Sequence, residues 1–114
     1  MTPDGPAGRE GRIIGVVARA LDVGVDELRF AQSGRGAYAR RLAAYVLWLD
    51  SGTDEVAAEA FTASLGGARW WRTYVRREMR HNQGVRRDLG RIARALYVEP
   101  RAPGRGVCQV GVGR

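Results

Sequence analysis

The sequence predicts an all-α fold: a compact bundle of about six helices that contains a helix-turn-helix and is flanked by flexible tails. Apolar residues recur at spacings of three and four through the central part of the chain. The regular alternation of apolar and polar residues that marks strands is absent there. Hairpins are also disfavoured, because no Asn-Gly or Asp-Gly pair occurs between residues 11 and 98.

The chain has the length of one domain. Its 114 residues, of which 45% are hydrophobic, provide for a modest single core. Residues 1–10 and 99–114 each contain two prolines and several glycines without a periodic apolar pattern. We therefore predict a flexible arm over residues 1–10, a helical domain over residues 11–98 and a flexible tail over residues 99–114.

Six segments carry the periodic pattern, and turn residues separate them. The predicted helices span residues 12–21, 25–29, 37–49, 54–64, 68–81 and 85–96. In the first helix, Val17 and Leu21 share the apolar face. In the second, Asp26 and Glu27 lie in the first turn, where negative charge complements the helix dipole.

The third helix is the longest and follows a loop predicted over residues 31–36. Its main apolar stripe runs through Leu42, Val46 and Leu49, and Ser51-Gly52 ends it.

The last three helices are predicted from caps and glycines. Thr53 is a plausible N-cap of the fourth helix, and Gly66-Gly67 separates the fourth helix from the fifth. Leu89, Ile92 and Leu96 share one face of the sixth.

The fourth helix, the glycine pair and the fifth helix form the predicted helix-turn-helix. On a helical wheel of the fifth helix, the apolar side chains and Glu78 point toward the core. The residues predicted to point outward are Arg69, Arg72, Thr73, Arg76 and Arg80. Such a row suits insertion into the major groove of DNA, which is about 12 Å wide and admits one helix. Free backbone N–H groups beside Gly67 are expected to hold a phosphate.

Two plainer interpretations stay open for this segment. Arginines on a helix often form a solvated surface, and the pair Trp70-Trp71 is explained equally by burial in the core or in a partner interface. A base-edge or sugar contact by Trp70 is the alternative.

The net charge of +7 favours a polyanionic partner. All 19 basic residues are arginines, and no apolar run is long enough to span a membrane. The single Cys108 permits no disulfide within one chain, and the single His81 has no catalytic partner at a telling spacing. We expect a cytoplasmic, nucleoid-associated protein that is not an enzyme and has no metal, cofactor or small-molecule substrate.

Four stretches, in order and spacing, carry a family resemblance over residues 12–97. They are RIIGVVARALDVGVDEL (12–28), ARRLAAYVL (39–47), LGGAR (65–69) and GVRRDLGRIARAL (84–96). Together they resemble the C-terminal DNA-binding domain of the bacterial replication initiator DnaA, a helix-turn-helix of the Trp-repressor-like type. The resemblance implies duplex DNA binding, with the fifth helix in the major groove and the loop before the third helix near the minor groove.

The resemblance also implies roles for individual residues. Arg35 would lie near the minor groove, and Arg40 matches a DNA-contacting arginine of the family, whereas Arg41 replaces a glutamine. Arg69 and Thr73 match the arginine and threonine of the recognition motif if Ala68 is taken as an insertion.

The chain departs from the family at Trp70 and Trp71, which replace an Asp-His pair that helps to recognise the initiator's target sequence. It also lacks a phosphate-binding loop of the G-x-x-x-x-G-K-[ST] type. We therefore expect a free-standing relative, most simply a monomer, that regulates transcription or replication in a bacterium, phage or mobile element.

Two other functions stay open. The chain is alternatively a protein-interaction module that keeps the fold, has lost DNA recognition and binds a replication or transcription protein. RNA binding is the third possibility.

Overall fold

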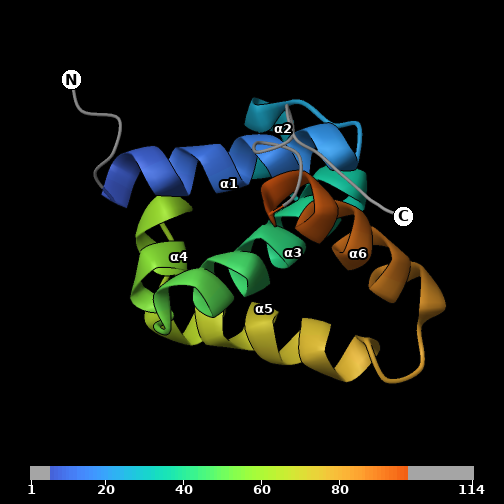
Figure 1. The fold of residues 1–114 in the computed structure, drawn as a ribbon. Coiled ribbons are helices and arrows are strands. Elements are labelled where there is room, and N and C mark those ends of the chain that lie inside the picture. The colour runs from blue at the N-terminus through green and yellow to red at the C-terminus, as the bar shows by residue number, and fades with distance from the viewer. Residues whose placement is uncertain (1–5, 98–114) are drawn as a thin grey trace.

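The computed structural model describes residues 6–97, which form six α-helices and no strand (Figure 1). In chain order the helices are α1 (Pro6–Ala20), α2 (Val25–Phe30), α3 (Gly34–Ser51), α4 (Glu55–Ala60), α5 (Leu65–Glu78) and α6 (Gln83–Tyr97). The predicted all-α bundle is therefore confirmed. Residues 1–5 of the predicted arm and the predicted tail over residues 99–114 lie outside the described residues.

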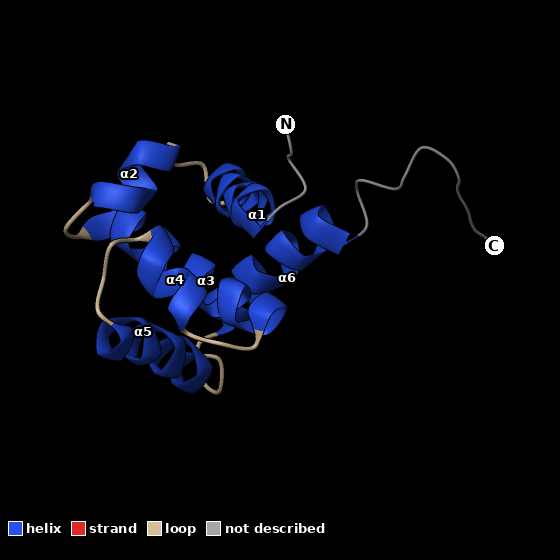
Figure 2. Ribbon diagram, turned by 90° about the vertical axis from the view of Figure 1, so that its left-hand side faces the viewer, coloured by secondary structure: helices blue, strands red, loops and turns tan. Residues whose placement is uncertain are grey.

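Helix α3 runs through the middle of the molecule and contacts α1, α2, α4 and α5. Its buried residues include Ala39, Leu42, Ala43, Ala44 and Leu47, which lie on several sides of the helix. A helix with buried residues on several sides is suited to a central position, because those sides pack against different neighbours. As a result, α1 and α5 lie on opposite sides of α3 (Figure 1 and Figure 2).

Helix α6 closes the bundle against α1. Its residues Ile92 and Leu96 are buried in the core. The Tyr38 hydroxyl of α3 donates a 2.6 Å hydrogen bond to Asp88 Oδ2 of α6. Burial, together with this hydrogen bond, raises the pKa of Tyr38. The bond therefore fixes the start of α3 to the first half of α6.

Four helices, α1, α3, α5 and α6, begin earlier than predicted. α1 begins at Pro6, so residues 6–10, predicted as part of a flexible arm, are helical instead. Proline is favoured at the start of a helix because its missing N–H would be unpaired there in any case. α3 begins at Gly34, so the predicted loop over residues 31–36 shrinks to residues 31–33 and Arg35 lies in a helix.

The turn before α5 is also displaced from its predicted position. It spans residues 61–64, with Thr62 at a φ of 52°, and the pair Gly66-Gly67 lies within the first turn of α5. The Ser64 side chain accepts a 2.9 Å hydrogen bond from the Gly67 N–H. A serine N-cap specifies a helix start, whereas glycine only lowers helical propensity, so the cap decides the boundary.

The end of α3 lies where it was predicted, whereas the burial of Leu49 and the end of α5 differ from the prediction. Gly52 ends α3 as predicted, at a φ of 80° in the left-handed region. Leu49 was predicted in the apolar stripe of α3, but 55% of its surface is exposed because no helix covers that side. α5 ends at Glu78 and not at His81, so Arg80 and His81 lie in the turn before α6.

Replacing Gly36 by Ala is expected to destabilise the fold by about 1–3 kcal/mol, because overpacking forces the backbone to shift. Gly36 is buried where α3 crosses α2, and an added Cβ would lie 2.5 Å from the Glu27 carbonyl oxygen and 2.7 Å from Ala31 Cβ. Gly15→Ala in α1 is the matched control, since nothing lies within 4 Å of its added Cβ. The control should gain about 0.5–1 kcal/mol. Urea denaturation measures both, and equal stability of the two variants would contradict the close approach.

Candidate nucleic-acid interface

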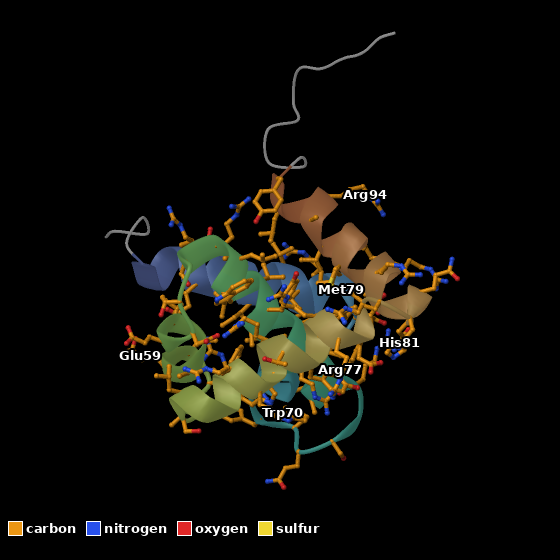
Figure 3. All side chains as sticks on the ribbon, turned by 90° about the horizontal axis from the view of Figure 1, so that it is seen from below. Glu59, Trp70, Arg77, Met79, His81 and Arg94 are labelled. Atoms are coloured by element: carbon orange, nitrogen blue, oxygen red, sulfur yellow. The ribbon has the colours of Figure 1, made fainter. Side chains whose placement is uncertain are left out.

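The face of α5 that points away from the core is cationic. Ala68 and Val75 are buried and hold the helix against the bundle. The exposed residues on the other side of α5 and in the turn after it are Arg69, Trp70, Thr73, Arg76, Arg77 and Arg80. We call this set the α5 face. Trp70 and Arg77 are labelled in Figure 3, in which α5 is seen from outside the bundle.

The two adjacent tryptophans have different surroundings. Trp71 is half-buried, with its ring edge-on to Phe61 at a centroid distance of 6.0 Å and with the Arg40 guanidinium 5.5 Å from its ring centroid. Trp70 is 54% exposed and stacks on Tyr74 at 5.4 Å. Trp71 therefore anchors α5, whereas Trp70 belongs to the exposed α5 face.

Arg72 does not stand outward, contrary to the prediction from the helical wheel. Its Nε and one terminal nitrogen each donate a 2.8 Å hydrogen bond to the Asp54 carboxylate, and its guanidinium lies 4.6 Å from the Trp48 ring centroid. The side chains of Arg72 and Asp54 are only 17% and 11% exposed. This bidentate ion pair and the low exposure of both side chains turn the Arg72 guanidinium toward α4, so its predicted outward orientation is wrong.

The ion pair shifts the pKa values of its two partners in opposite directions, and each shift favours the charged form. The hydrogen bonds from Arg72 lower the pKa of Asp54, more than burial raises it, and those same bonds raise the pKa of Arg72. The sequence placed Asp54 only at the start of the predicted fourth helix. No pattern links two residues 18 positions apart, so the pair emerges only when α4 packs against α5.

Arg40 is also occupied within the protein. It donates to the backbone carbonyls of Leu28, Arg29 and Ala31, at 3.2, 2.8 and 2.7 Å. These carbonyls lie at the C-terminal end of α2 and have no helical partners of their own. The structure therefore places the Arg40 guanidinium, which was predicted to contact DNA, at the C-terminal end of α2, where it caps that helix.

Three further residues predicted for the site, Arg35, Arg41 and Gly67, make contacts within the protein. Arg35 donates a 2.8 Å hydrogen bond from Nε to the Leu21 carbonyl at the end of α1, although the residue as a whole stays exposed. Arg41 is half-buried, with its guanidinium 5.0 Å from the Tyr74 ring centroid. The Gly67 N–H is not free for a phosphate, because Ser64 accepts its hydrogen bond.

Sequence analysis missed one member of the α5 face. Arg77 lies four residues after Thr73 and seven after Trp70, so helical spacing alone would have placed it there. It also missed the exposed arginines of α6, which are Arg86, Arg87, Arg91 and Arg94.

Positive charge is unevenly distributed along the described chain. Residues 65–97 contain nine arginines and two carboxylates, whereas residues 6–64 contain seven arginines and eight carboxylates. Both carboxylates of the basic half have partners. Glu78 lies 3.6 Å from His81 and accepts a hydrogen bond from Asn82, and Asp88 accepts one from Tyr38. The excess charge of the described residues therefore lies on α5 and α6.

Within residues 6–97, no His, Cys, Asp and Glu side chains gather in a group of three that would suit a metal ion. None of the described helices combines the length and apolar character needed to cross a membrane. No protein-family model, curated protein or solved structure matches this chain.

Replacing Asp54 by Ala is expected to lower the free energy of unfolding by about 3 kcal/mol at neutral pH, because it leaves Arg72 unpaired and largely buried. The folded-state pKa of Asp54 lies below its ordinary value of 3.8. Its stabilisation is therefore complete above that value and is lost as the pH falls through the lower folded-state pKa. Urea denaturation of wild type and variant at pH 7 and below pH 3.8 should show the difference shrink in acid.

Asp50→Ala is the control, because the Asp50–Arg9 contact is longer, at 3.7 Å, and the Arg9 side chain is 67% exposed. Its effect should stay within about 0.5 kcal/mol. A similar small loss in Asp54→Ala would show that the Arg72 ion pair contributes little.

Proposed function

We propose that this protein binds double-stranded DNA through the α5 face and regulates transcription or replication. The observation that carries the proposal is the excess of nine arginines over two carboxylates in residues 65–97. Four of these arginines stand on the α5 face, and within residues 6–97 only Arg69 among them approaches a carboxylate, 4.0 Å from Asp54. A helix that presents unneutralised arginines suits a partner with regularly spaced phosphates.

The shape of the molecule also supports this proposal. α5 forms one side of the bundle, and its full length is uncovered on the side away from α3 (Figure 1). Helix α4 and the turn over residues 61–64 lead into it, which is the order of elements in a helix-turn-helix. In such proteins the N-terminal part of the second helix contacts base edges, and the remainder contacts the backbone.

Under this proposal the buried arginines have a supporting role. Arg72 fixes α5 to α4 through Asp54, and Arg40 fixes the end of α2 while lying against Trp71 of α5. The DNA contacts then fall to Arg69, Thr73, Arg76, Arg77 and Arg80, together with Trp70. Arg35 and Arg41 are peripheral candidates.

The resemblance to the DNA-binding domain of the replication initiator supports the same orientation, with α5 in the major groove. It gives no target sequence, because Trp70 and Trp71 stand in place of the family's Asp-His pair. We therefore propose a regulator whose preferred DNA sequence differs from the target sequence of the initiator.

Replacing both Arg76 and Arg80 by Ala is expected to weaken duplex DNA binding by about 1–3 kcal/mol and to reduce the salt dependence by about two phosphate contacts. For the wild type, about five contacts predict a slope of log affinity against log salt near −4 to −5. Fluorescence anisotropy with a labelled duplex at several salt concentrations measures both quantities.

Arg19→Ala is the control, since Arg19 is exposed on α1, on the opposite side of α3, and its loss removes one positive charge. It should change the slope much less. No duplex binding by the wild type at low salt would refute the proposal, and structured RNA that outcompetes duplex DNA would replace it with RNA binding.

An apolar groove favours a second function, that of a protein-interaction module. It has a volume of about 370 Å³ and lies between the C-terminal half of α3, the end of α5 and α6. Leu49, Leu89 and Tyr97 contribute apolar lining, and Arg86 contributes a cation. The occupant that fits best is an apolar segment with flanking carboxylates, carried by a replication or transcription protein.

If this second function holds, a pull-down with such a protein should survive nuclease and high salt. Leu49→Glu should abolish it, because Leu49 is exposed and its replacement puts a negative charge into the groove. Arg76→Ala with Arg80→Ala should leave it unchanged. The opposite pattern would assign the interaction to the α5 face.

A further inference from the structure

Trp70 is a large apolar group in the middle of a cationic surface. It lies in the second turn of α5, beside Arg69 and three residues before Thr73, and all three are exposed. Figure 3 shows Trp70 near the N-terminal end of α5, on the outer side of the bundle. Water solvates arginine well but gains nothing from an exposed indole ring, so this position suggests a contact with a partner.

The ring is held in place by a stack. Its plane lies 18° from that of Tyr74 at a centroid distance of 5.4 Å, and the Arg41 guanidinium lies 5.0 Å from the Tyr74 ring centroid. One face of the indole is therefore covered by Tyr74, which leaves the opposite face and the ring edge available. A rigid aromatic side chain loses little conformational entropy on binding.

We propose that Trp70 contacts the 5-methyl group of thymine in the major groove and so gives the protein a preference for thymine. This inference rests on the proposed DNA-binding function. Most groups that base edges present in the major groove are hydrogen-bond donors and acceptors, and the thymine methyl is the apolar exception. An exposed indole near the N-terminus of a groove-binding helix is apolar, and the thymine methyl is the apolar group that it can contact there.

The neighbouring residues agree with this assignment. Thr73 carries a methyl group one helical turn further along, and threonine methyls also contact thymine. Arg69 directly precedes Trp70 and Arg77 lies two helical turns after it, and both are exposed on the α5 face, where they suit contacts with phosphates. An aromatic ring also stacks on unpaired bases, but a helix that lies in a duplex groove meets the edges of base pairs and not their faces.

The test compares two duplexes that differ only in methyl groups. A preferred site is first selected from a randomised duplex pool, and its thymines are then replaced by uracil, which keeps base pairing. Wild-type affinity should fall about fourfold for each contacted methyl group, measured by fluorescence anisotropy. Trp70→Ala should lose less affinity than the wild type when thymine is replaced by uracil, because the variant lacks the indole that contacts the methyl group.

Two further variants guard against indirect effects. Phe30→Ala removes another aromatic ring, 72% exposed on α2, and should respond to uracil as the wild type does. Trp70→Phe keeps an apolar ring and should keep part of the response. Any change in DNA shape caused by uracil affects every variant alike and therefore cancels in the comparison.

Each outcome has a definite meaning. Equal wild-type affinity for both duplexes overturns the methyl contact and leaves DNA binding intact. An equal loss in wild type and Trp70→Ala also overturns it, because another residue then detects the methyl. Tighter binding to single-stranded DNA that disappears in Trp70→Ala assigns the ring to base stacking. Absence of any DNA binding removes the proposed function and this inference together.

Discussion

The ion pair between Arg72 and Asp54, together with the burial of Ala68 and Val75, fixes which side of α5 faces outward. The two hydrogen bonds of 2.8 Å join the middle of α5 to the start of α4, and Trp48 of α3 lies against the same guanidinium. Three helices therefore meet at one side chain. With Arg72 turned inward, Trp70, two residues earlier and on the opposite side of the helix, is left in solvent, as is Thr73, the residue that follows Arg72.

Arginine has a second structural role in this protein, which is to bind backbone carbonyls near helix ends. Arg40 does so at the end of α2, Arg35 at the end of α1 and Arg91 at Ala20, where its Nη1 lies 3.1 Å from the carbonyl oxygen. The last carbonyls of a helix lack intrahelical partners, and the helix dipole places negative charge there. Guanidinium groups, with five N–H donors each, satisfy several of these carbonyls at once.

Arginines that bind carbonyls stabilise the fold without losing their positive charge. A carbonyl is neutral overall, so an arginine that binds one keeps its full positive charge. Among the described residues, Arg72 and Asp54 form the one ion pair shorter than 3 Å. Because so few arginines are neutralised, the fold retains the excess positive charge that the proposed DNA-binding surface needs, and this excess lies on α5 and α6.

Local sequence determined the helical class, the number of helices and most of the core, because apolar spacing and end signals such as Gly52 act within a few residues. It also determined that α5 is basic. Only the tertiary structure decided which arginines are free: Arg40 and Arg72 match an exposed pattern in sequence, yet each finds a buried partner on another helix. Such partners depend on how helices pack and on desolvation, neither of which has a fixed sequence spacing. The boundary at Ser64 was misplaced for a different, local reason: a single capping hydrogen bond to the Gly67 N–H outweighed the helix-breaking propensity of two glycines.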